Sequence, residues 1–531
     1  MATINPKTAL EPAPSLSPSP SRGFIATPAH EAIFDAIREK ARNIVIEAVA
    51  GAGKTTTIIE ALRLVPSTER CVFLAFNASI AKELARRVPS HVEARTLNSL
   101  GHRAWGRHVE QTTGKRNAVK VDGDKLMSIL RSAQERGLLS RDEDRCGMAA
   151  LKLARLGKSN GIIVDNVPRA GLIPDTHAEW TRIADHFDVE PPEFLRNGLE
   201  VTIEVARKLL KASTQDLLTI DFDDQLYLPF TYNVDCFRYD RVFVDESQDL
   251  SPLQHDLLAR SLRKGGQVVA VGDPAQAIYG FRGADSRSMA TLREAFNAIT
   301  LPLHVSYRCP RAVVARAQRC VQHIQAHPEA PLGTVDETRH AADKADLRPG
   351  DLVVSRTSAP VVALAYLLLR RRVPVEVLGR DVGKGLTVLI KKLKPSTVAD
   401  LLAKLDKWEV REVEKARARN ADAKVAAIED KADTVRVLCD DAETVPEVLS
   451  TIEHLFSGDR DANRVCLATV HKAKGLEADR VWILNPHLMP HPMAKQAWQR
   501  EQERNLEYVA VTRAKAELRF AVYDVKDRRP G

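Results

Sequence analysis

The sequence predicts an α/β fold with two parallel-sheet domains, and three observations support this. Short apolar runs alternate with amphipathic helical stretches, as is typical of a parallel sheet covered by helices on both faces. The alternation occurs twice, before and after residue 300, and each half contains a helix-rich segment. The chain has 531 residues, too many for one hydrophobic core. We therefore expect roughly two to four domains.

The first domain is expected to follow a tail over residues 1–23 whose Pro- and Ser-rich composition predicts disorder. This domain is expected at 24–110 and again at 216–300. Between the two parts, 111–215 has long amphipathic stretches and few strand signals, which indicates a helical insertion. The strands of the first domain are expected at 42–48, 71–76, 241–244 and 267–271, with helices at 56–62 and 79–87.

The second domain is expected at 301–385 and 448–531, and it also contains an insertion. Residues 386–447 are helical and dense in mixed charge, which predicts a small insertion with a solvated face. The strands of the second domain are expected at 351–355, 373–378, 464–469, 480–484 and 517–525.

Composition indicates a soluble, reduced, nucleic-acid-compatible protein. Hydrophobic residues make up 44% of the chain and charged residues 28%, and no apolar run reaches the ~18–20 residues of a membrane span. Seven scattered cysteines without a Cys-x-x-Cys pair predict free thiols, no disulfides and no zinc site. A net charge of +8 suits a polyanionic partner, although many soluble proteins are mildly basic. We expect a cytoplasmic location, nucleoid-associated if the source is bacterial or viral.

Residues 48–55 form a candidate phosphate-binding loop between an expected strand and an expected helix. Backbone N–H groups of such a loop surround phosphate oxygens at a helix N-terminus, where the helix dipole favours negative charge. Lys54 would reach the β- and γ-phosphates of ATP, and Thr55 would coordinate Mg²⁺. The alternative is a chance glycine turn. The candidate nucleotide-binding residues of this segment are Ala48, Val49, Ala50, Gly51, Ala52, Gly53, Lys54, Thr55 and Thr56.

Two adjacent carboxylates follow the expected strand at 241–244 and would lie at the carboxyl edge of the sheet, where ligands of open α/β sheets bind. Asp245 suits a metal ligand, and Glu246 suits the group that orients and deprotonates water. Two surface acids at a strand end are the alternative reading.

Further strings follow in chain order, and together with the loop and the acids they resemble the motifs of superfamily 1A DNA helicases of the UvrD, Rep and PcrA type. The resemblance runs from about residue 24 to 523. It is carried by the strings at 75–79, 95–102, 221–226, 272–284, 305–308, 468–477 and 503–514.

This resemblance implies two RecA-like motor domains that close on ATP and Mg²⁺. Gln276 would sense the γ-phosphate, and Arg308 and Arg513 would supply positive charge to the transferring phosphoryl group. Tyr307 would stack on adenine and Glu477 would bind the ribose, although a core tyrosine is the simpler reading of Tyr307. The implied catalytic residues are Lys54, Asp245, Glu246, Gln276, Arg308 and Arg513.

The resemblance also implies a channel for single-stranded DNA. Tyr279 and Phe281 follow a strand with Arg282 beside them, and exposed aromatic rings there would stack on bases of any sequence. Core packing is the alternative for Phe76 and Phe281. The implied DNA-binding residues are Phe76, Asn77, Thr96, Asn98, Ser99, Tyr279, Phe281, Arg282 and His471.

Three departures from the family pattern change the expectations. His30 stands where the family usually reads adenine with Gln, so adenine specificity is expected to be looser. Asn98 stands where many relatives have His. The segment 386–447 is small, and we expect a reduced regulatory arm with less dependence on dimerisation or activators.

We expect a monomeric ATP-dependent motor that moves on single-stranded DNA and unwinds partial duplexes in replication, recombination or repair. The polarity, 3′ to 5′, follows from the resemblance alone. Three alternatives stay open: a translocase that strips proteins from DNA without efficient unwinding, an inactive scaffold, and an RNA helicase.

Overall fold

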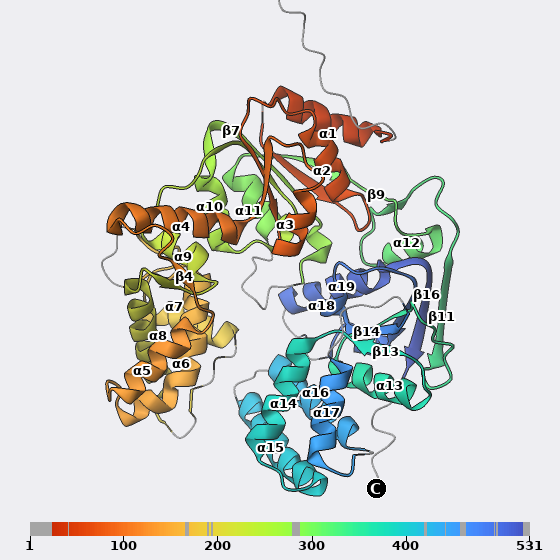
Figure 1. Cartoon of the computed structure of the whole chain (residues 1–531). Coiled ribbons are helices and arrows are strands. Elements are labelled where there is room, and N and C mark those ends of the chain that lie inside the picture. The colour runs from red at the N-terminus through yellow and green to blue at the C-terminus, as the bar shows by residue number, and fades with distance from the viewer. Residues whose placement is uncertain are drawn as a thin grey trace, which may run out of the picture.

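Two six-stranded parallel sheets organise the chain, which confirms the predicted α/β class (Figure 1). The computed structural model describes residues 24–40, 42–164, 169–187, 189, 191–192, 195–278, 287–418, 422–440, 442–456, 463–492, 494 and 497–523. The predicted tail at 1–23 and the predicted DNA contacts Tyr279, Phe281 and Arg282 lie outside these residues.

The first sheet has the strand order β3-β2-β6-β7-β1-β8. Its central strands are continuous apolar runs, because both faces of a parallel sheet are covered by helices. All five residues of β2 are buried. The strands are β1 (Ile44–Ala48), β2 (Cys71–Ala75), β3 (Val92–Thr96), β6 (Tyr239–Val244), β7 (Leu262–Gly272) and β8 (Ile299–Leu303).

Seven helices belong to the described part of this first domain. They are α1 (Pro28–Glu39), α2 (Lys54–Leu62), α3 (Ala78–Leu84), α4 (Leu97–Thr113), α9 (Asp224–Thr231), α10 (Pro252–Arg260) and α11 (Ser288–Ala295).

The four described helices between α4 and α9 form a body of their own beside the first sheet (Figure 1). They fall within the predicted insertion at 111–215. A buried ion-pair cluster ties them to α9: the Lys125 and Lys158 ammonium groups lie 2.8 and 2.6 Å from the Asp224 carboxylate. The helices are α5 (Lys125–Glu135), α6 (Arg141–Ser159), α7 (His177–His186) and α8 (Gly198–Gln215).

The second sheet has the order β11-β16-β15-β12-β14-β13, again with parallel pairing throughout. Its strands are β11 (Thr334–Ala341), β12 (Leu352–Ser355), β13 (Val375–Val377), β14 (Val465–Thr469), β15 (Ala478–Leu484) and β16 (Ala514–Val522). The helices around it are α12 (Arg311–Ala317), α13 (Ser358–Arg370), α18 (Val470–Ala473) and α19 (Ala497–Val511).

A second helical segment lies between β13 and β14 and packs below the second sheet in Figure 1. It runs from residue 380 to 455 and so extends beyond the predicted 386–447 at both ends. The domain boundaries drawn from the sequence stay predictions. The helices are α14 (Arg380–Leu393), α15 (Val398–Ala418), α16 (Asp422–Cys439) and α17 (Val445–Leu455).

One hydrophobic cluster is continuous across both sheets, and it contains residues of the phosphate-binding loop. Ala50 of the loop belongs to the same cluster as Val354 of β12 and Tyr508 of α19. The other face of each sheet packs against its own helical insertion. The loop therefore lies where the two domains meet.

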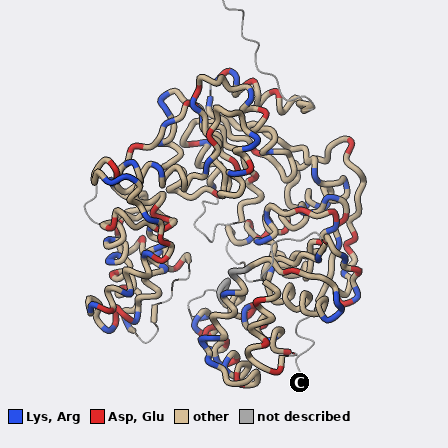
Figure 2. The backbone as a smooth tube through the Cα atoms, in the orientation of Figure 1, with Lys and Arg blue, Asp and Glu red and all other residues tan. Residues whose placement is uncertain are grey.

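Charge and cysteine chemistry agree with a solvated α/β protein. Lys and Arg are interspersed with Asp and Glu over the described part of the chain (Figure 2). The seven cysteines are free thiols. Within the described ranges, no helix is long and apolar enough to cross a membrane.

Candidate nucleotide and nucleic-acid site

The loop between β1 and α2 has the backbone that phosphate binding requires. Gly51 and Gly53 both have φ of +75°, a left-handed conformation that glycine adopts without strain. Gly53 is the N-cap of α2 and no side chain caps that helix end. The N-terminus of α2 can therefore receive an anion.

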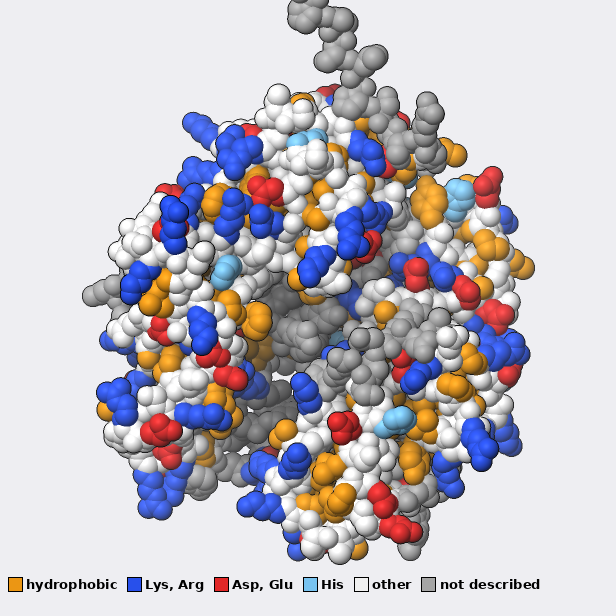
Figure 3. Space-filling view, viewed as in Figure 1, with side chains coloured by type: hydrophobic (Ala, Val, Ile, Leu, Met, Phe, Trp, Pro, Cys, Tyr) orange, Lys and Arg blue, Asp and Glu red, His pale blue; other side chains and the backbone are white. Residues whose placement is uncertain are grey.

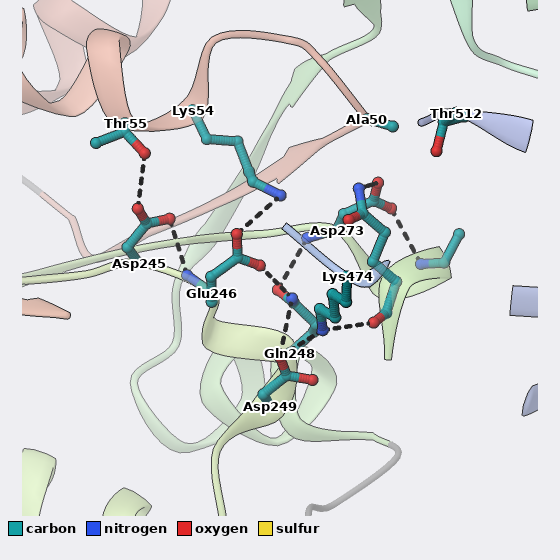
Figure 4. A network of polar contacts seen from close by, with 12 residues as sticks. Ala50, Lys54, Thr55, Asp245, Glu246, Gln248, Asp249, Asp273, Lys474 and Thr512 are labelled. Atoms are coloured by element: carbon teal, nitrogen blue, oxygen red, sulfur yellow. Dashed lines mark hydrogen bonds and ion pairs between the residues drawn. The ribbon is translucent and has the colours of Figure 1, made fainter. Parts of the chain in front are cut away.

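Lys54 and Thr55 of α2 face the two acids that follow β6 (Figure 4). The Lys54 ammonium lies 3.6 Å from the Glu246 carboxylate, and the Thr55 hydroxyl donates a 2.9 Å hydrogen bond to Asp245. Burial would lower the pKa of Lys54, but Glu246, Asp273 and Asp245 outweigh it and raise that pKa. Lys54 is therefore a charged ammonium at neutral pH.

The pKa values of the two acids are shifted in opposite directions. Burial, together with the charge of Glu246, raises the pKa of Asp245. Burial would also raise the pKa of Glu246, but the charges of Lys54 and Lys474 outweigh it and lower that pKa. Glu246 therefore stays ionised at neutral pH, while its lowered pKa makes it a weaker base, and its role in orienting and deprotonating water stays a prediction.

The arrangement fits a magnesium ion. The Thr55 hydroxyl and the Asp245 carboxylate are adjacent hard oxygen ligands, and Mg²⁺ is bound by few protein oxygens together with water and substrate phosphates. The described residues contain no cluster of three or more His, Cys, Asp or Glu that would hold a metal by protein ligands alone. These two residues are the ones that would hold Mg²⁺.

A chain of amides joins the acids to the segment after β7. Gln248 donates a 2.5 Å hydrogen bond to Glu246, and its side-chain oxygen accepts one of 3.1 Å from the Asp273 backbone N–H. Gln276, which is 5% exposed, donates a 2.7 Å hydrogen bond to the Asp273 carboxylate. Gln276 is thus held in the same network as Glu246, as a sensor of the phosphate would need to be.

Two arginines lie beside the loop, one after β9 (Val305–Ser306) and one between α19 and β16. Arg308 pairs with Glu477 at 2.5 Å, and an added Cβ on Gly51 would come within 2.5 Å of the Arg308 Cβ. Arg513 is 1% exposed and donates to the Val509 carbonyl at 2.9 Å. Burial and the charge of Arg308 lower the pKa of Arg513 to about 10. Arg513 therefore keeps its charge at neutral pH.

Two residues that were not selected from the sequence, Tyr508 and Lys474, join the domains directly. The Ala50 backbone N–H donates a 2.9 Å hydrogen bond to the Tyr508 hydroxyl. Lys474, which follows α18, lies 2.5 Å from Asp249 and donates a 2.8 Å hydrogen bond to the Gln276 carbonyl (Figure 4). Both lie inside strings that signalled the family, but neither residue type by itself indicates such a contact.

Comparison with known proteins agrees with this geometry. Residues 29–297 match the UvrD/REP helicase N-terminal domain, and residues 401–524 match the UvrD-like helicase C-terminal domain. The chain belongs to the UvrD-like helicase family. The first match alone covers just over half of the chain, from α1 to the turn before β8.

The curated relatives share about a quarter of the aligned residues with this chain and are longer. It is 25% identical over 503 residues to F-box DNA helicase 1 of Gallus gallus, covering 90% of this chain and 47% of the relative. It is 26% identical over 522 residues to F-box DNA helicase protein 1 of Schizosaccharomyces pombe, covering 89% and 55%. It is 24% identical over 331 residues to ATP-dependent DNA helicase PcrA of Staphylococcus epidermidis, covering 57% and 41%. The chain thus spans about half the length of these relatives.

The aromatic residues predicted around the nucleotide base lie together. Tyr307 is 47% exposed, and its backbone N–H donates a 2.9 Å hydrogen bond to the Gly51 carbonyl. The His30 ring is stacked with the Tyr307 ring at a centroid distance of 6.4 Å, and His327 lies on Tyr307 at 4.9 Å. Three aromatic rings, those of His30, Tyr307 and His327, therefore lie together next to the candidate phosphate loop.

Several residues predicted to contact DNA hold helix ends in the structure. Asn77 caps α3 by accepting a 2.9 Å hydrogen bond from the Ile80 N–H. Thr96 and Ser99 form a capping box at the start of α4. Asn98 donates a 3.1 Å hydrogen bond to the Phe222 carbonyl. A DNA contact for these four side chains stays a prediction.

Phe76 is exposed and His471 lines a cavity, and a DNA contact for either residue stays a prediction. Phe76 is 47% exposed at the end of β2. His471 on α18 lines a cavity of about 610 Å³ between the first insertion and the second domain. Figure 3 shows the face hollowed between these two parts. The cavity is also lined by Lys152, Phe187, Thr357, Ser358, Asp430 and Trp498.

Proposed function

We propose that this chain is an ATP-dependent DNA motor that moves along single-stranded DNA and unwinds duplex DNA. Its relatives are named DNA helicases, and the family match supports this activity class. We further propose 3′-to-5′ movement, on the family resemblance of its motifs, and action as a monomer in replication, recombination or repair.

One observation carries the proposal: the loop that would hold the ATP phosphates is itself hydrogen-bonded to the second domain. The Ala50 N–H donates to the Tyr508 hydroxyl, and the Gly51 carbonyl accepts from the Tyr307 N–H. A nucleotide that enters or leaves the loop must change the surroundings of both contacts. Chemistry at the loop is therefore coupled to the position of one domain against the other.

The residues of the chain have distinct parts in hydrolysis. Mg²⁺, when bound, neutralises charge on the phosphates, and Thr55 and Asp245 would hold it. Glu246, ionised at neutral pH, would orient the attacking water and take its proton. Lys54, Arg308 and Arg513 would place positive charge around the transferring phosphoryl group, where arginines contribute roughly 10³–10⁵ in rate.

On the nucleic-acid side, the exposed ring of Phe76 and the cavity lined by His471 support a single-strand path. Stacking on such a ring contributes about 1–3 kcal/mol per base and does not depend on sequence. The stacking platform proposed from Tyr279, Phe281 and Arg282 lies outside the described residues.

Unwinding of partial duplexes tests the proposal. Substrates with a 3′ or a 5′ overhang are incubated with ATP and Mg²⁺, and strand separation is compared between the wild type and Lys54→Ala. We expect separation of the 3′-overhang substrate by the wild type only. Absence of DNA-stimulated ATP hydrolysis would refute the motor function. Hydrolysis and displacement of a DNA-bound protein without strand separation would favour the protein-stripping translocase.

A further inference from the structure

The first insertion touches the second domain through a pair of aromatic rings. His186 is the last residue of α7, and Trp498 is the second residue of α19. Their ring centroids are 5.3 Å apart and their planes are inclined by 36°. This pair therefore joins the first insertion to the helix that also carries Tyr508.

The end of α7 is held so that it presents His186 in a fixed position. The Lys152 ammonium of α6 donates a 2.6 Å hydrogen bond to the carbonyl of Phe187, the residue after His186. A cation at this end of a helix is also favoured by the helix dipole. The Phe187 ring meets the His186 ring edge-on at a centroid distance of 4.7 Å. The His186 ring is thus supported from the insertion side before it meets α19.

Helix α19 carries Trp498 at one end and is bound to the first domain further along. The Asn505 amide donates a 3.1 Å hydrogen bond to the Ala277 carbonyl, and the Tyr508 hydroxyl accepts from the Ala50 N–H. Tyr508 lies about 15 Å along the helix from Trp498. These two hydrogen bonds fix the helix against the first domain, and so they also fix the place of Trp498.

The ring pair lies beside the cavity of about 610 Å³. Lys152 and Phe187 line this cavity from the first insertion, and Trp498 lines it from α19. Among the described residues that line it, Trp498 is present and His186 is not. The wall formed by the insertion and the wall formed by α19 therefore meet at the ring pair.

A single strand that uses the predicted contacts has to reach from the first domain into this cavity. Phe76 and Asn98 belong to the first domain, whereas His471 lines the cavity from α18. The first domain, its insertion, the ring pair and α19 form a closed circuit, because α19 is itself bound to the first domain. A strand end can thread through a closed circuit, but an internal stretch of a strand can enter only when the circuit opens.

We propose that His186 and Trp498 form a latch that closes this cavity around single-stranded DNA. The inference rests on the proposed function, because it assumes that the strand occupies the cavity. An aromatic pair shifts an equilibrium by a factor of roughly two to thirteen. A factor of this size lets the latch open readily for loading and still slows the escape of a bound strand.

Circular single strands test the latch directly, because they have no end to thread. The probe is a thymidine oligonucleotide, either linear or ligated into a circle. His186→Cys and Trp498→Cys are combined and joined by a short bismaleimide, with each single-cysteine variant as the matched control. Six of the seven native cysteines are buried, which limits other reactions.

The order of joining and mixing gives opposite expectations. Protein that is joined before mixing should bind the linear strand but bind the circle at least about tenfold more weakly. Protein that is joined after mixing with the circle should stay on it in salt that releases the single-cysteine controls. High salt removes the electrostatic part of binding but does not open a covalent ring.

Release rates provide the second arm. His186→Ala removes the latch from the insertion side, and Trp498→Ala removes it from the cavity wall. Both should speed release from the circle by roughly two- to thirteen-fold, and the double variant should be no faster than either single variant. Trp498→Phe keeps a ring and should restore most of the slow release. Melting temperatures are measured for all four variants, so that a loss of folding is recognised.

The outcomes separate the latch from the function on which it rests. Equal binding of circles and linear strands by the protein joined before mixing would overturn the latch, and so would release of the trapped circle in high salt. Faster release in Trp498→Ala but not in His186→Ala would show that Trp498 contacts the strand and closes nothing. If the wild type bound neither form of the strand, the proposed motor function would fail instead.

Discussion

Removal of the Lys474 ammonium is expected to disconnect the nucleotide site from the second domain. Lys474 is 9% exposed and Asp249 is 2% exposed in their side chains, and their charged atoms are 2.5 Å apart. Lys474→Met keeps the aliphatic stem but leaves the Asp249 carboxylate buried without this partner. Removing one member of a buried ion pair typically costs about 3–5 kcal/mol. The Gln276 carbonyl also loses its 2.8 Å donor.

The loss of stability in Lys474→Met should depend on pH, and the pKa of Asp249 sets its direction. Burial raises the pKa of Asp249 to about 6, with Lys474 opposing it. The unfolded value lies near 3.9, so the folded state binds a proton first and stability falls as pH rises from about 4 to 6. Without Lys474 the folded pKa rises further and this window extends upward. The stability deficit of Lys474→Met should therefore be larger at pH 8 than at pH 5.

A double-mutant cycle with Asp249→Asn isolates the pair. Free energies for the first urea transition are measured for the wild type, both single variants and the double variant at both pH values. We expect the two changes to be strongly non-additive at pH 8, with a coupling energy of about 1–3 kcal/mol, and nearly additive at pH 5. DNA-stimulated ATP hydrolysis should fall with stability in Lys474→Met. Additivity at pH 8, or full DNA stimulation in Lys474→Met, would refute the bridge as a coupling element.

Three further substitutions test other contacts. Lys54→Ala should lower DNA-stimulated hydrolysis by about 10³-fold or more while single-strand binding stays measurable by fluorescence anisotropy; turnover at the wild-type rate would remove the active-site assignment. Tyr508→Phe leaves the Ala50 N–H unpaired and should lower stability by about 1–3 kcal/mol, seen as a lower melting temperature, and an unchanged melting temperature would contradict that contact. Asp430→Ala removes the carboxylate that accepts from the first two N–H groups of α13 and should cost about 0.5–2 kcal/mol; higher stability would show that its burial outweighs the cap.

The same Asp430 contact bears on the second insertion. The small size of 386–447 led us to expect a reduced regulatory arm, which stays a prediction. Asp430 lies on α16 of that segment and accepts hydrogen bonds of 2.9 and 2.7 Å from Ser358 and Ala359 of the second domain. Deleting 395–440 would remove this cap as well as the arm. Point substitutions on the exposed face of α15, such as Val410→Ser, therefore test regulation without disturbing α13.

Strands were predictable from the sequence where both sheet faces are covered. Central strands such as β2 are continuous apolar runs. The strand predicted at 71–76 is observed at Cys71–Ala75. Two of the edge strands lack this pattern: β3 has one buried residue out of five, and β11 is mostly polar and exposed. Neither was predicted, because an edge strand pairs through its backbone and its side chains carry little signal.

The candidate site was predictable as far as local motifs specify it. The phosphate-binding loop, the two acids and the start of α2 lie in sequence motifs whose residue spacing indicates their chemistry. The structure brings the Thr55 hydroxyl to 2.9 Å from the Asp245 carboxylate, although the two residues are 190 positions apart. The contacts between domains were not predictable. Tyr508 lies 458 residues from Ala50, and a buried tyrosine in a helix reads as core until its hydroxyl is seen to accept a hydrogen bond.

The Ala50 contact indicates how the two domains could respond to a nucleotide. A backbone N–H makes one strong hydrogen bond at a time, and the Ala50 N–H already donates to Tyr508. A phosphate oxygen that accepted from this group would leave the Tyr508 hydroxyl, buried in α19, without its donor. An unpaired buried polar group destabilises by about 1–3 kcal/mol. This free-energy cost would fall on the second domain rather than on the loop, because the unpaired hydroxyl belongs to α19. That free energy is comparable to typical coupling energies between sites, so one hydrogen bond is enough to bias the domain arrangement.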